Sequence, residues 1–471
     1  MKNRLPFLLA FFILTAILIL PISNLIGLQG ANEIIPVLPG RSEDFAKVSE
    51  ILQNKCVDCH APGMLRKPIY SELPIAKQLM EHDIDRGQAR LVLTKNLFNG
   101  EQRFTPLQLA RIEHVVNNEL MPPTLYLTMH WNGRLTPAER QTVLDWIAKE
   151  RASSPWSKDA APQFRGEPIQ PLPLKVELDA DKVALGQKLF HDPRLSGDNT
   201  VSCASCHDLT RGGTDQAKVS TGIRGQQGGI NSPTVYNAVY NIAQFWDGRA
   251  KNLQEQAAGP VANPIEMGAQ WDEVVEKVKQ VPEYQEAFGK LYPEQCISKS
   301  TITDAIAVFE QSLVTGNSRF DQYLRGNTGI LNEQETQGYE LFRANCTSCH
   351  FGPTLGGLSF EKMGVKHDYF KQRGGELTDA DNGRFNVTQL GQDLHVSKVP
   401  TLRNIELTYP YFHDGSTYNL AEVIHIMGKD QLDKTFTDDE TAKLVAFLLT
   451  LTGEYKGKPL TELNTADIQK P

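Results

Sequence analysis

Apolar side chains recur three and four positions apart in three stretches of the chain, which is the period of an amphipathic helix. Each stretch predicts a helix with one buried face. The faces consist of Phe45, Val48, Ile51 and Leu52, then Leu185, Leu189 and Phe190, and finally Tyr339 and Phe342. Long glycine-rich segments such as 212–229 carry little strand signal. The fold class is therefore predicted to be mainly α, with long loops.

Polar capping residues mark where several helices begin. Asn332 and Glu335 form a capping-box pattern ahead of the third apolar face. Thr136 and Thr437 each stand three residues before a glutamate and open a further helix. The apolar residues of these two helices are Val143, Trp146 and Ile147, and Leu444, Leu448 and Leu451. The first and third segments of the chain are thus predicted to end on similar helices.

The N-terminus has the pattern of a membrane anchor. Lys2 and Arg4 precede an apolar stretch, Leu5 to Leu28, that approaches the length of a membrane span, and positive charge belongs on the cytoplasmic side. A cleaved signal peptide with its apolar region at 7–20 is the alternative, but no clear small-x-small cleavage site follows it. We therefore expect a single-pass transmembrane helix over 1–30 in the cytoplasmic (inner) membrane, with the rest of the chain in the periplasm.

Charge and composition narrow the function classes. A net charge of -8 and a pI near 5.8 argue against nucleic acid as a partner. A hydrophobic content of 40% suits a globular protein with ordinary cores. A proline-rich stretch over 153–173 is predicted to link a first domain to the rest of the chain.

Six of the 7 cysteines fall into three copies of the pattern Cys-x-x-Cys-His. The copies are Cys56, Cys59 and His60, then Cys203, Cys206 and His207, and then Cys346, Cys349 and His350. This is the haem c attachment signature, in which the thiols bond to the haem vinyl groups and the histidine ligates the iron. Disulfides and a zinc site are disfavoured because every pair is followed by histidine and lacks a second pair of ligands nearby. Three covalent haem c groups are predicted, while Cys296 is interpreted as a thiol without a chemical role.

Three haem groups divide the chain into segments of about 150 residues, a normal domain size. After the anchor, we predict three cytochrome c-like haem domains with long loops. They are a monohaem domain over 40–155, a second haem domain over 165–330 and a third over 331–471.

The sixth ligand of each iron decides whether that haem carries electrons or binds a substrate. For haem one, Met121 stands before two prolines that stiffen its loop, and Met80 and Met129 are weaker candidates. For haem three, Met427 lies shortly before the closing helix, with Met363 as the rival. A thioether ligand raises the reduction potential, so both haems are predicted to be high-potential carriers.

Haem two has no comparable ligand. Between His207 and the third domain the only methionine is Met267, and no histidine occurs. Instead, Gln256 and Glu266 lie in one short stretch. We infer an open iron with a carboxyl group nearby, which is suited to acid–base chemistry on bound peroxide.

Long motifs occur between residue 165 and the end of the chain. They are Asn231-Ser232-Pro233-Thr234-Val235-Tyr236-Asn237-Ala238, Gln244-Phe245-Trp246-Asp247-Gly248-Arg249-Ala250, Glu255-Gln256-Ala257, Pro400-Thr401-Leu402-Arg403-Asn404 and Tyr411-Phe412-His413-Asp414-Gly415. In these motifs the chain resembles the bacterial dihaem cytochrome c peroxidase family. The extra N-terminal haem domain and the anchor match the trihaem, membrane-attached branch of that family, the quinol peroxidases.

The resemblance implies roles for residues near haem two. That haem would be the peroxidatic one, with Glu266 as a proton shuttle and Gln256 as its hydrogen-bonding companion over the iron. Trp246 would lie between haems two and three and help electrons to cross.

The resemblance also implies the ligands of two further centres. Haem three would be the electron-transferring haem, with His350 and Met427 as axial ligands. A calcium ion would lie between haems two and three at Asn231, Thr408 and Pro410, held by oxygen atoms, which suit calcium.

One position departs from the family. Many members carry a histidine in the loop before the Asn-Ser-Pro-Thr motif, and it blocks the peroxidatic iron until haem three is reduced. The aligned residue here is Ile223, which cannot ligate iron. His191 is the only other histidine of the domain before that motif. The resting lock is therefore predicted to be missing.

The function predicted is a peroxidase that reduces hydrogen peroxide to water. Its electrons would come from a membrane quinol or a small c-type cytochrome and pass from haem one through haem three to haem two. One alternative is a multihaem electron-transfer protein without its own substrate, which would need a sixth ligand on haem two. Another is a protein-modifying dihaem oxidase, but such relatives use tyrosine where Met427 stands. The oligomeric state is open, with a homodimer as one alternative.

Overall fold

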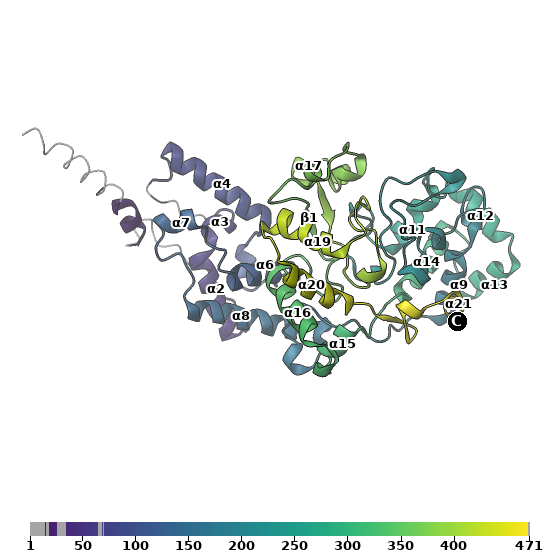
Figure 1. The fold of residues 1–471 in the computed structure, drawn as a ribbon, viewed down its shortest axis with the longest axis horizontal. Helices are drawn as coiled ribbons and strands as arrows, with labels where there is room; N and C mark the ends of the chain where they lie inside the picture. The colour runs from purple at the N-terminus through teal and green to yellow at the C-terminus, as the bar shows by residue number, and fades with distance from the viewer. Residues whose placement is uncertain (1–14, 16–17, 26–33, 65–67, 69, 470–471) are drawn as a thin grey trace, which may run out of the picture. The chain divides into compact units, whose positions relative to one another are not determined.

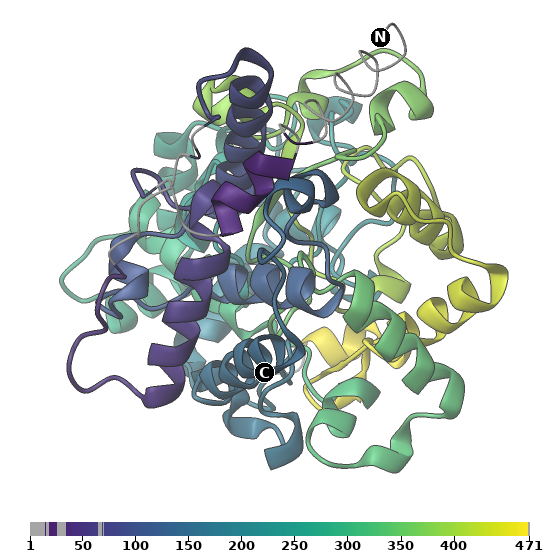
Figure 2. The same cartoon turned by 90° about the vertical axis from the view of Figure 1, so that its left-hand side faces the viewer.

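The computed structural model describes residues 15, 18–25, 34–64, 68 and 70–469 of the 471-residue chain. The chain falls into two compact units, Met1–Ser153 and Ser154–Pro471. Both are built of helices joined by long irregular segments, as Figures 1 and 2 show. The predicted mainly α fold is confirmed.

The first unit packs around helices near its two ends. Its helices are α2 (Glu43–Lys55), α3 (Val57–His60), α4 (Pro74–Arg90), α5 (Lys95–Phe98), α6 (Pro106–Asn117), α7 (Thr124–Met129) and α8 (Pro137–Ala152). The predicted faces of α2 and α8 meet in one apolar cluster, where the rings of Phe45 and Trp146 lie 6.0 Å apart. Helix α8 begins with the predicted capping box of Thr136 and Glu139, which satisfies two backbone N–H groups.

The expected transmembrane helix is not borne out. In the described part of the chain, no helix is long and apolar enough to cross a membrane. Residues 18–25 of the predicted anchor are helical, and most of its other residues lie outside those described. This finding contradicts the expected single-pass anchor and, with it, the expected location in the cytoplasmic membrane.

The second unit contains the remaining helices and four short strands. The helices are α9 (Ala180–Phe190), α10 (Cys203–Cys206), α11 (Leu253–Ala262), α12 (Trp271–Lys279), α13 (Pro282–Leu291), α14 (Lys299–Ser312), α15 (Arg319–Leu324), α16 (Glu333–Asn345), α17 (Tyr369–Arg373), α18 (Phe385–Thr388), α19 (Leu420–Met427), α20 (Asp438–Leu449) and α21 (Thr465–Gln469). The strands form two antiparallel pairs, β1 (Phe360–Lys362) with β2 (Val396–Lys398) and β3 (Glu454–Tyr455) with β4 (Lys458–Pro459).

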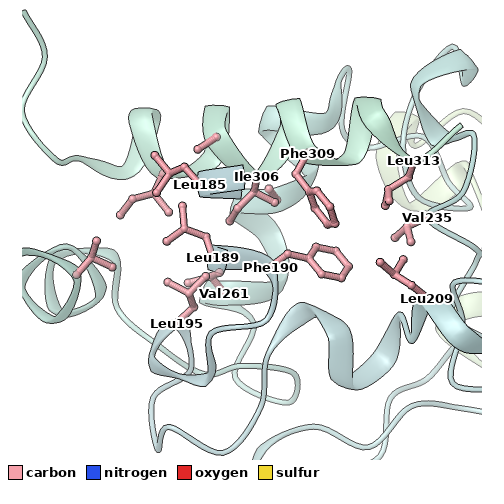
Figure 3. Close-up of a cluster of buried hydrophobic side chains, with 14 of the residues drawn as sticks. Leu185, Leu189, Phe190, Leu195, Leu209, Val235, Val261, Ile306, Phe309 and Leu313 are labelled. Atoms are coloured by element: carbon pink, nitrogen blue, oxygen red, sulfur yellow. The ribbon is translucent and has the colours of Figure 1, made fainter. Parts of the chain in front are cut away.

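Two helix pairs in this unit cross in the same way, and glycine permits both crossings. Helix α9 passes α14 so closely that a Cβ at Gly186 would collide with the carbonyl oxygen of Ala305 and press on Phe309. Helix α16 passes α20 at Gly338, where a Cβ would collide with the carbonyl oxygen of Lys443. Figure 3 shows the apolar side chains packed beside the first crossing. Each crossing joins two helices that flank a Cys-x-x-Cys-His motif in the sequence.

A fully buried ion pair joins the two halves of this unit, which are the segment of the second haem motif (165–330) and the segment of the third (331–471). Arg403 and Asp321 are both 0% exposed and lie 2.8 Å apart. The Arg403 guanidinium also donates to Ser318 Oγ and to the carbonyl oxygens of Gln170 and Pro353. Because both side chains are fully buried, loss of either partner would leave an uncompensated charge, and the pair favours one arrangement of its segments.

The proline-rich stretch over 153–173 is irregular, as predicted, but it is part of the second unit rather than a free tether. Ile169 and Leu172 are fully buried, and the Leu172 N–H donates to Asp321. The Gly352 N–H donates to the Pro168 carbonyl oxygen. These contacts place the stretch against the helices around the third haem motif.

The C-terminal segment returns to the helices of the second haem motif. Its apolar residues belong to the cluster of Figure 3, which also includes residues of α9 and α14. They are Tyr455, Leu460, Leu463 and Ile468. The Gln187 side chain of α9 donates to the Ile468 carbonyl oxygen. The core around the second motif is therefore completed by residues that follow the third.

Candidate functional site

None of the six cysteines of the three motifs is in a disulfide, and each motif adjoins the end of a helix. Cys56 caps α2 and Cys346 caps α16, while Cys203 opens α10. Burial raises the pKa of the thiols of Cys56, Cys203 and Cys346 to about 12 each. The cysteines are thus enclosed in apolar surroundings and unpaired, which suits two thioether bonds to one haem and not a disulfide.

The three motif histidines share one geometry. The Nδ1 atom of His60 lies 2.8 Å from the Leu91 carbonyl oxygen, that of His207 lies 3.3 Å from Gly213 and that of His350 lies 2.9 Å from Leu355. A carbonyl acceptor at Nδ1 fixes the neutral tautomer and leaves Nε2 for a metal. Burial also lowers the pKa of His207 and His350, which favours the neutral ligand form. The residues of all three motifs therefore fit haem attachment.

The methionine ligands stay predictions, and the structure shows where they lie. Met121 is 44% exposed in the loop between α6 and α7. Met427 is the last residue of α19, and a π-helical turn, Gly428–Leu432, follows it directly. Gln431 of that turn donates to Met363 Sδ, 3.4 Å away, so the rival methionine already has a hydrogen bond. Turns of this kind are frequent at functional sites.

Glu266, the predicted proton shuttle, is half-buried directly after α11. The Asn263 side chain donates to its Oε1 at 2.6 Å and holds the carboxylate in place. Burial raises the pKa of Glu266, while the nearby positive charge of Arg249 and the hydrogen bond from Asn263 lower it. Burial raises the pKa of the Cys206 thiol most, and the charges of Asp215 and Glu266 add to this shift. Glu266 is thus within electrostatic reach of the second haem motif.

The side chains around Glu266 come from two motifs of the sequence. Gln256 lies half-buried on α11, the helix that leads to Glu266. The Arg249 guanidinium stacks on Phe245, 3.5 Å from the ring centroid, and pairs with Asp247 at 2.9 Å. Stacking and pairing fix the arginine charge that acts on the Glu266 carboxylate.

The loop that would carry the blocking histidine lies on the Glu266 segment. The Ile223 N–H donates to the Glu266 carbonyl oxygen at 2.8 Å, and the Ile223 side chain is only 2% exposed, packed toward Gly268. His191, by contrast, is exposed at the end of α9, and its Nδ1 hydrogen-bonds to the Gln187 carbonyl oxygen in its own helix. The residue that the resemblance aligns with the lock is therefore a buried apolar side chain on the Glu266 segment, and the missing lock stays a prediction.

We expect Ile223→His to install the lock. The backbone N–H of residue 223 is hydrogen-bonded to Glu266, and under the predicted arrangement the new imidazole would ligate the iron of haem two. Fully oxidised wild type should change its Soret spectrum promptly on mixing with peroxide in a stopped-flow instrument. The variant should become low-spin and respond at least about tenfold more slowly until it is reduced. Ile223→Val is the matched control, and an unchanged response of the histidine variant would contradict the prediction.

Trp246 contacts the segment of the third haem motif. Its indole N–H donates to the Asn231 carbonyl oxygen at 2.9 Å, and its ring lies edge-on to His413 with centroids 6.4 Å apart. The Lys398 N–H donates to the Trp246 carbonyl oxygen. The indole thus connects residues from both halves of the unit.

His413 belongs to a buried polar network that sequence reasoning missed. Its Nε2 lies 2.8 Å from Asp381, and Arg373 pairs with Asp381 at 2.6 Å and with Asp414 at 2.8 Å. Bonding to Arg373 and His413 holds the Asp381 pKa well below its usual range, although burial opposes this shift. The motif containing His413 and Asp414 was visible in the sequence, but Arg373 and Asp381 belong to no motif.

The segment 216–218 contacts one predicted calcium ligand and the neighbour of another. The Asn231 side chain donates to the Ala217 carbonyl oxygen at 2.9 Å, and Gln216 donates to the Leu407 carbonyl oxygen, next to Thr408. Among the described residues, the acidic and histidine side chains that could hold a metal are instead Asp381, His413 and Asp414, where Arg373 already binds both carboxylates. Calcium at Asn231, Thr408 and Pro410 stays a prediction.

Comparison with known proteins decides the family. A family model described as di-haem cytochrome c peroxidase matches residues 180–329, a haem-binding domain model matches 36–149 and a cytochrome c model matches 335–452. The chain is 46% identical to cytochrome c peroxidase Ccp of Escherichia coli over 414 residues, which cover 87% of this chain and 88% of that protein. The chain belongs to the di-haem cytochrome c peroxidase family.

Further relatives agree with this family membership. Cytochrome c551 peroxidase of Nitrosomonas europaea is 50% identical, over 61% of this chain and 85% of its own. The crystal structure of a MauG-like protein associated with microbial copper homeostasis matches with a TM-score of 0.53 and 31% identity, and covers 62% of this chain and 95% of its own. The protein is therefore a haem c oxidoreductase of the cytochrome c peroxidase type.

In a member of the di-haem cytochrome c peroxidase family, one further buried side chain suits contact with a haem. Lys398 is buried, and burial alone lowers its pKa to about 8. A buried ammonium group of this kind suits an anionic neighbour, and a haem propionate has that chemistry. Nothing in the local sequence marks Lys398, because its burial depends on the pairing of β2 with β1.

Proposed function

We propose that this member of the di-haem cytochrome c peroxidase family reduces hydrogen peroxide to water with two electrons and two protons. Three c-type haems would take part, bound at the motifs that begin with Cys56, Cys203 and Cys346. Electrons would enter at the first, pass to the third and reach the second. The haem at the second motif would be held by Cys203, Cys206 and His207 and would supply the redox chemistry of peroxide reduction. The remaining chemistry belongs to side chains.

Glu266 would accept a proton from the peroxide oxygen nearer the iron and return it to the outer oxygen, which leaves as water. The observation that carries this role is the half-buried Glu266 carboxylate, held by Asn263 and within electrostatic reach of Cys206. Its raised pKa brings the carboxylate closer to the pH of reaction, so that it gains strength as a base. Gln256 would bind the outer peroxide oxygen, and Trp246 would connect haem three to haem two.

A small c-type cytochrome is the electron donor that we propose, with a quinol as the alternative. The names of the relatives support a cytochrome, since they are cytochrome c and cytochrome c551 peroxidases. The test is to mix the holoprotein with a pre-reduced small c-type cytochrome and peroxide. Two cytochromes should be oxidised for each peroxide consumed, and mass spectrometry should find three haems on each chain. Absence of peroxide-dependent oxidation with either donor would contradict the proposal.

We expect the first haem to accept electrons from the donor, and we expect Met121→Ala to prevent this transfer. Loss of the thioether lowers the potential of haem one, so electrons would no longer be drawn from the donor. Turnover with reduced cytochrome should fall more than about tenfold, while turnover with small artificial reductants that reach the other haems should persist. Met129→Ala, eight positions along the same segment, is the matched control. Equal activity of both variants would remove Met121 from the path.

A further inference from the structure

One buried carboxyl group of the second unit has no part in the function proposed above. Glu310 lies on α14 with 4% of its surface exposed. Among the described residues, its Oε2 is buried without a hydrogen-bond partner, and no charged side chain offsets the effect of burial on its pKa. An unpaired carboxyl in a core destabilises the fold unless it stays protonated or meets a partner absent from the chain. Burial raises the pKa of Glu310 to about 8.

The carboxyl of Glu310 acts on the second haem motif. Burial raises the pKa of the Cys203 thiol, and the charge of Glu310 raises it further. Cys203 packs against the apolar cluster of Figure 3. Ile306 and Leu313, about one helical turn to either side of Glu310, belong to this cluster, so Glu310 lies on the face of α14 that is turned toward it. In the proposed attachment, Cys203 would bind haem two by a thioether bond and would not be an iron ligand.

The third haem segment shows that the fold does not require a carboxyl here. At the two equivalent crossings, Gly186 faces Ala305 and Phe309, and Gly338 faces Lys443 and Phe447. The residue that follows Phe309 is Glu310, and the residue that follows Phe447 is Leu448, which is 5% exposed. The same position thus carries leucine in the segment of haem three and an acid in the segment of haem two.

The groups that surround Glu310 leave its charge unbalanced. On the helices packed against α14, most charged side chains pair elsewhere, and the charge of Glu310 acts on the Cys203 thiol, which would no longer titrate as a thioether. The other pairs are Asp181 with Lys290, Lys182 with Asp304, Lys188 with Glu283, and Lys279 with Glu276. Glu255 of α11 accepts a hydrogen bond from the Lys251 N–H, and Lys277 of α12 donates one to Asn199. Burial raises the pKa of Tyr240, and the charge of Asp159 adds to this shift.

We propose that Glu310 is a redox-linked protonation site of the haem attached at Cys203, so that one proton binds when that haem gains one electron. The electron comes from the donor and reduces the iron from ferric to ferrous. The proton comes from solvent and forms an O–H bond on the Glu310 carboxylate, so the buried charge is unchanged. Charges interact strongly in a medium of low dielectric constant, and the carboxylate therefore stabilises the oxidised haem. Reoxidation releases the proton.

This inference rests on the proposed attachment of a haem at Cys203, and the experiment separates the two. The reduction potential of haem two is measured by spectroelectrochemistry on the full-length holoprotein at pH values on both sides of the Glu310 pKa of about 8. In wild type it should fall with rising pH by up to 59 mV per unit, the equivalent of a tenfold change in proton concentration for one electron. In Glu310→Gln and in Glu310→Leu, which copies Leu448, this dependence should disappear over the same range.

Glu283→Gln, on the surface of the same segment, is the matched control and should keep the wild-type slope. If both Glu310 variants retain the slope while the haem is attached and peroxide is consumed, the inference is wrong and the proposed function stands. If mass spectrometry finds no haem at Cys203 in wild type, both are wrong. Glu310→Gln keeps the shape of the native side chain, so this variant should fold. Its haem absorption spectrum tests folding independently of the potential.

Discussion

Glu266→Gln should lose most of its peroxide turnover while every haem stays attached and reducible. An amide cannot accept the proton that the mechanism assigns to the carboxylate, and general acid–base groups contribute about a hundredfold to ten-thousandfold. The substitution keeps the side-chain shape, so the contact with Asn263 can be made. The measurement is steady-state oxidation of reduced cytochrome by peroxide, with haem content checked by absorption.

The pH profile gives this prediction a second readout. Because burial raises the pKa of Glu266, wild-type activity should fall on the acid side through a pKa above the ordinary glutamate value, as the base becomes protonated. The Gln variant should lack this limb. Glu255→Gln, an exposed residue of the preceding helix, should behave as wild type. A loss below about threefold in Glu266→Gln would mean that the group is not the base.

Arg403→Met should destabilise the second unit by about 3–5 kcal/mol, since it leaves Asp321 as an uncompensated buried charge. Chemical unfolding followed by absorption of the haems and by circular dichroism measures the change. The loss of stability should be largest where the segment of haem two packs against the segment of haem three, because Arg403 joins these segments.

Two further variants show whether the charge is the cause. Arg403→Met combined with Asp321→Leu removes both charges and should recover part of the lost free energy of unfolding. Lys188→Met breaks an exposed pair with Glu283 and should cost less than about 1 kcal/mol. A cost as small for Arg403→Met would show that the buried pair contributes little.

Much of the fold could be predicted because its signals are local. Each capping box consists of residues within four consecutive positions, and all three begin helices as expected. They are at Thr136, Asn332 and Thr437. The haem motifs are equally local, and their histidines have the carbonyl contacts that ligation needs. The apolar N-terminal pattern was also local but led to the wrong expectation, since the described residues contain no spanning helix.

The polar networks could not be predicted because they join distant segments. His413 lies in a motif, yet its partner Asp381 and their common neighbour Arg373 come from other loops with no periodic pattern. Glu310 is the opposite case: its sequence position on an apolar helix is plain, but its burial depends on the crossing at Gly186. The sequence alone does not show which carboxyl group will be buried where two helices cross at a glycine.

The C-terminal residues that enter the cluster beside Cys203 also constrain how the protein is made. A growing chain presents Cys203 and Cys206 well before Tyr455, Leu460 and Ile468 have been synthesised, yet these late residues complete the core around them. The core around the second motif can therefore close only after the C-terminal residues have been synthesised. A chain cut short after α20 would lack the residues that complete this core, although the helices that flank the third motif would all be present.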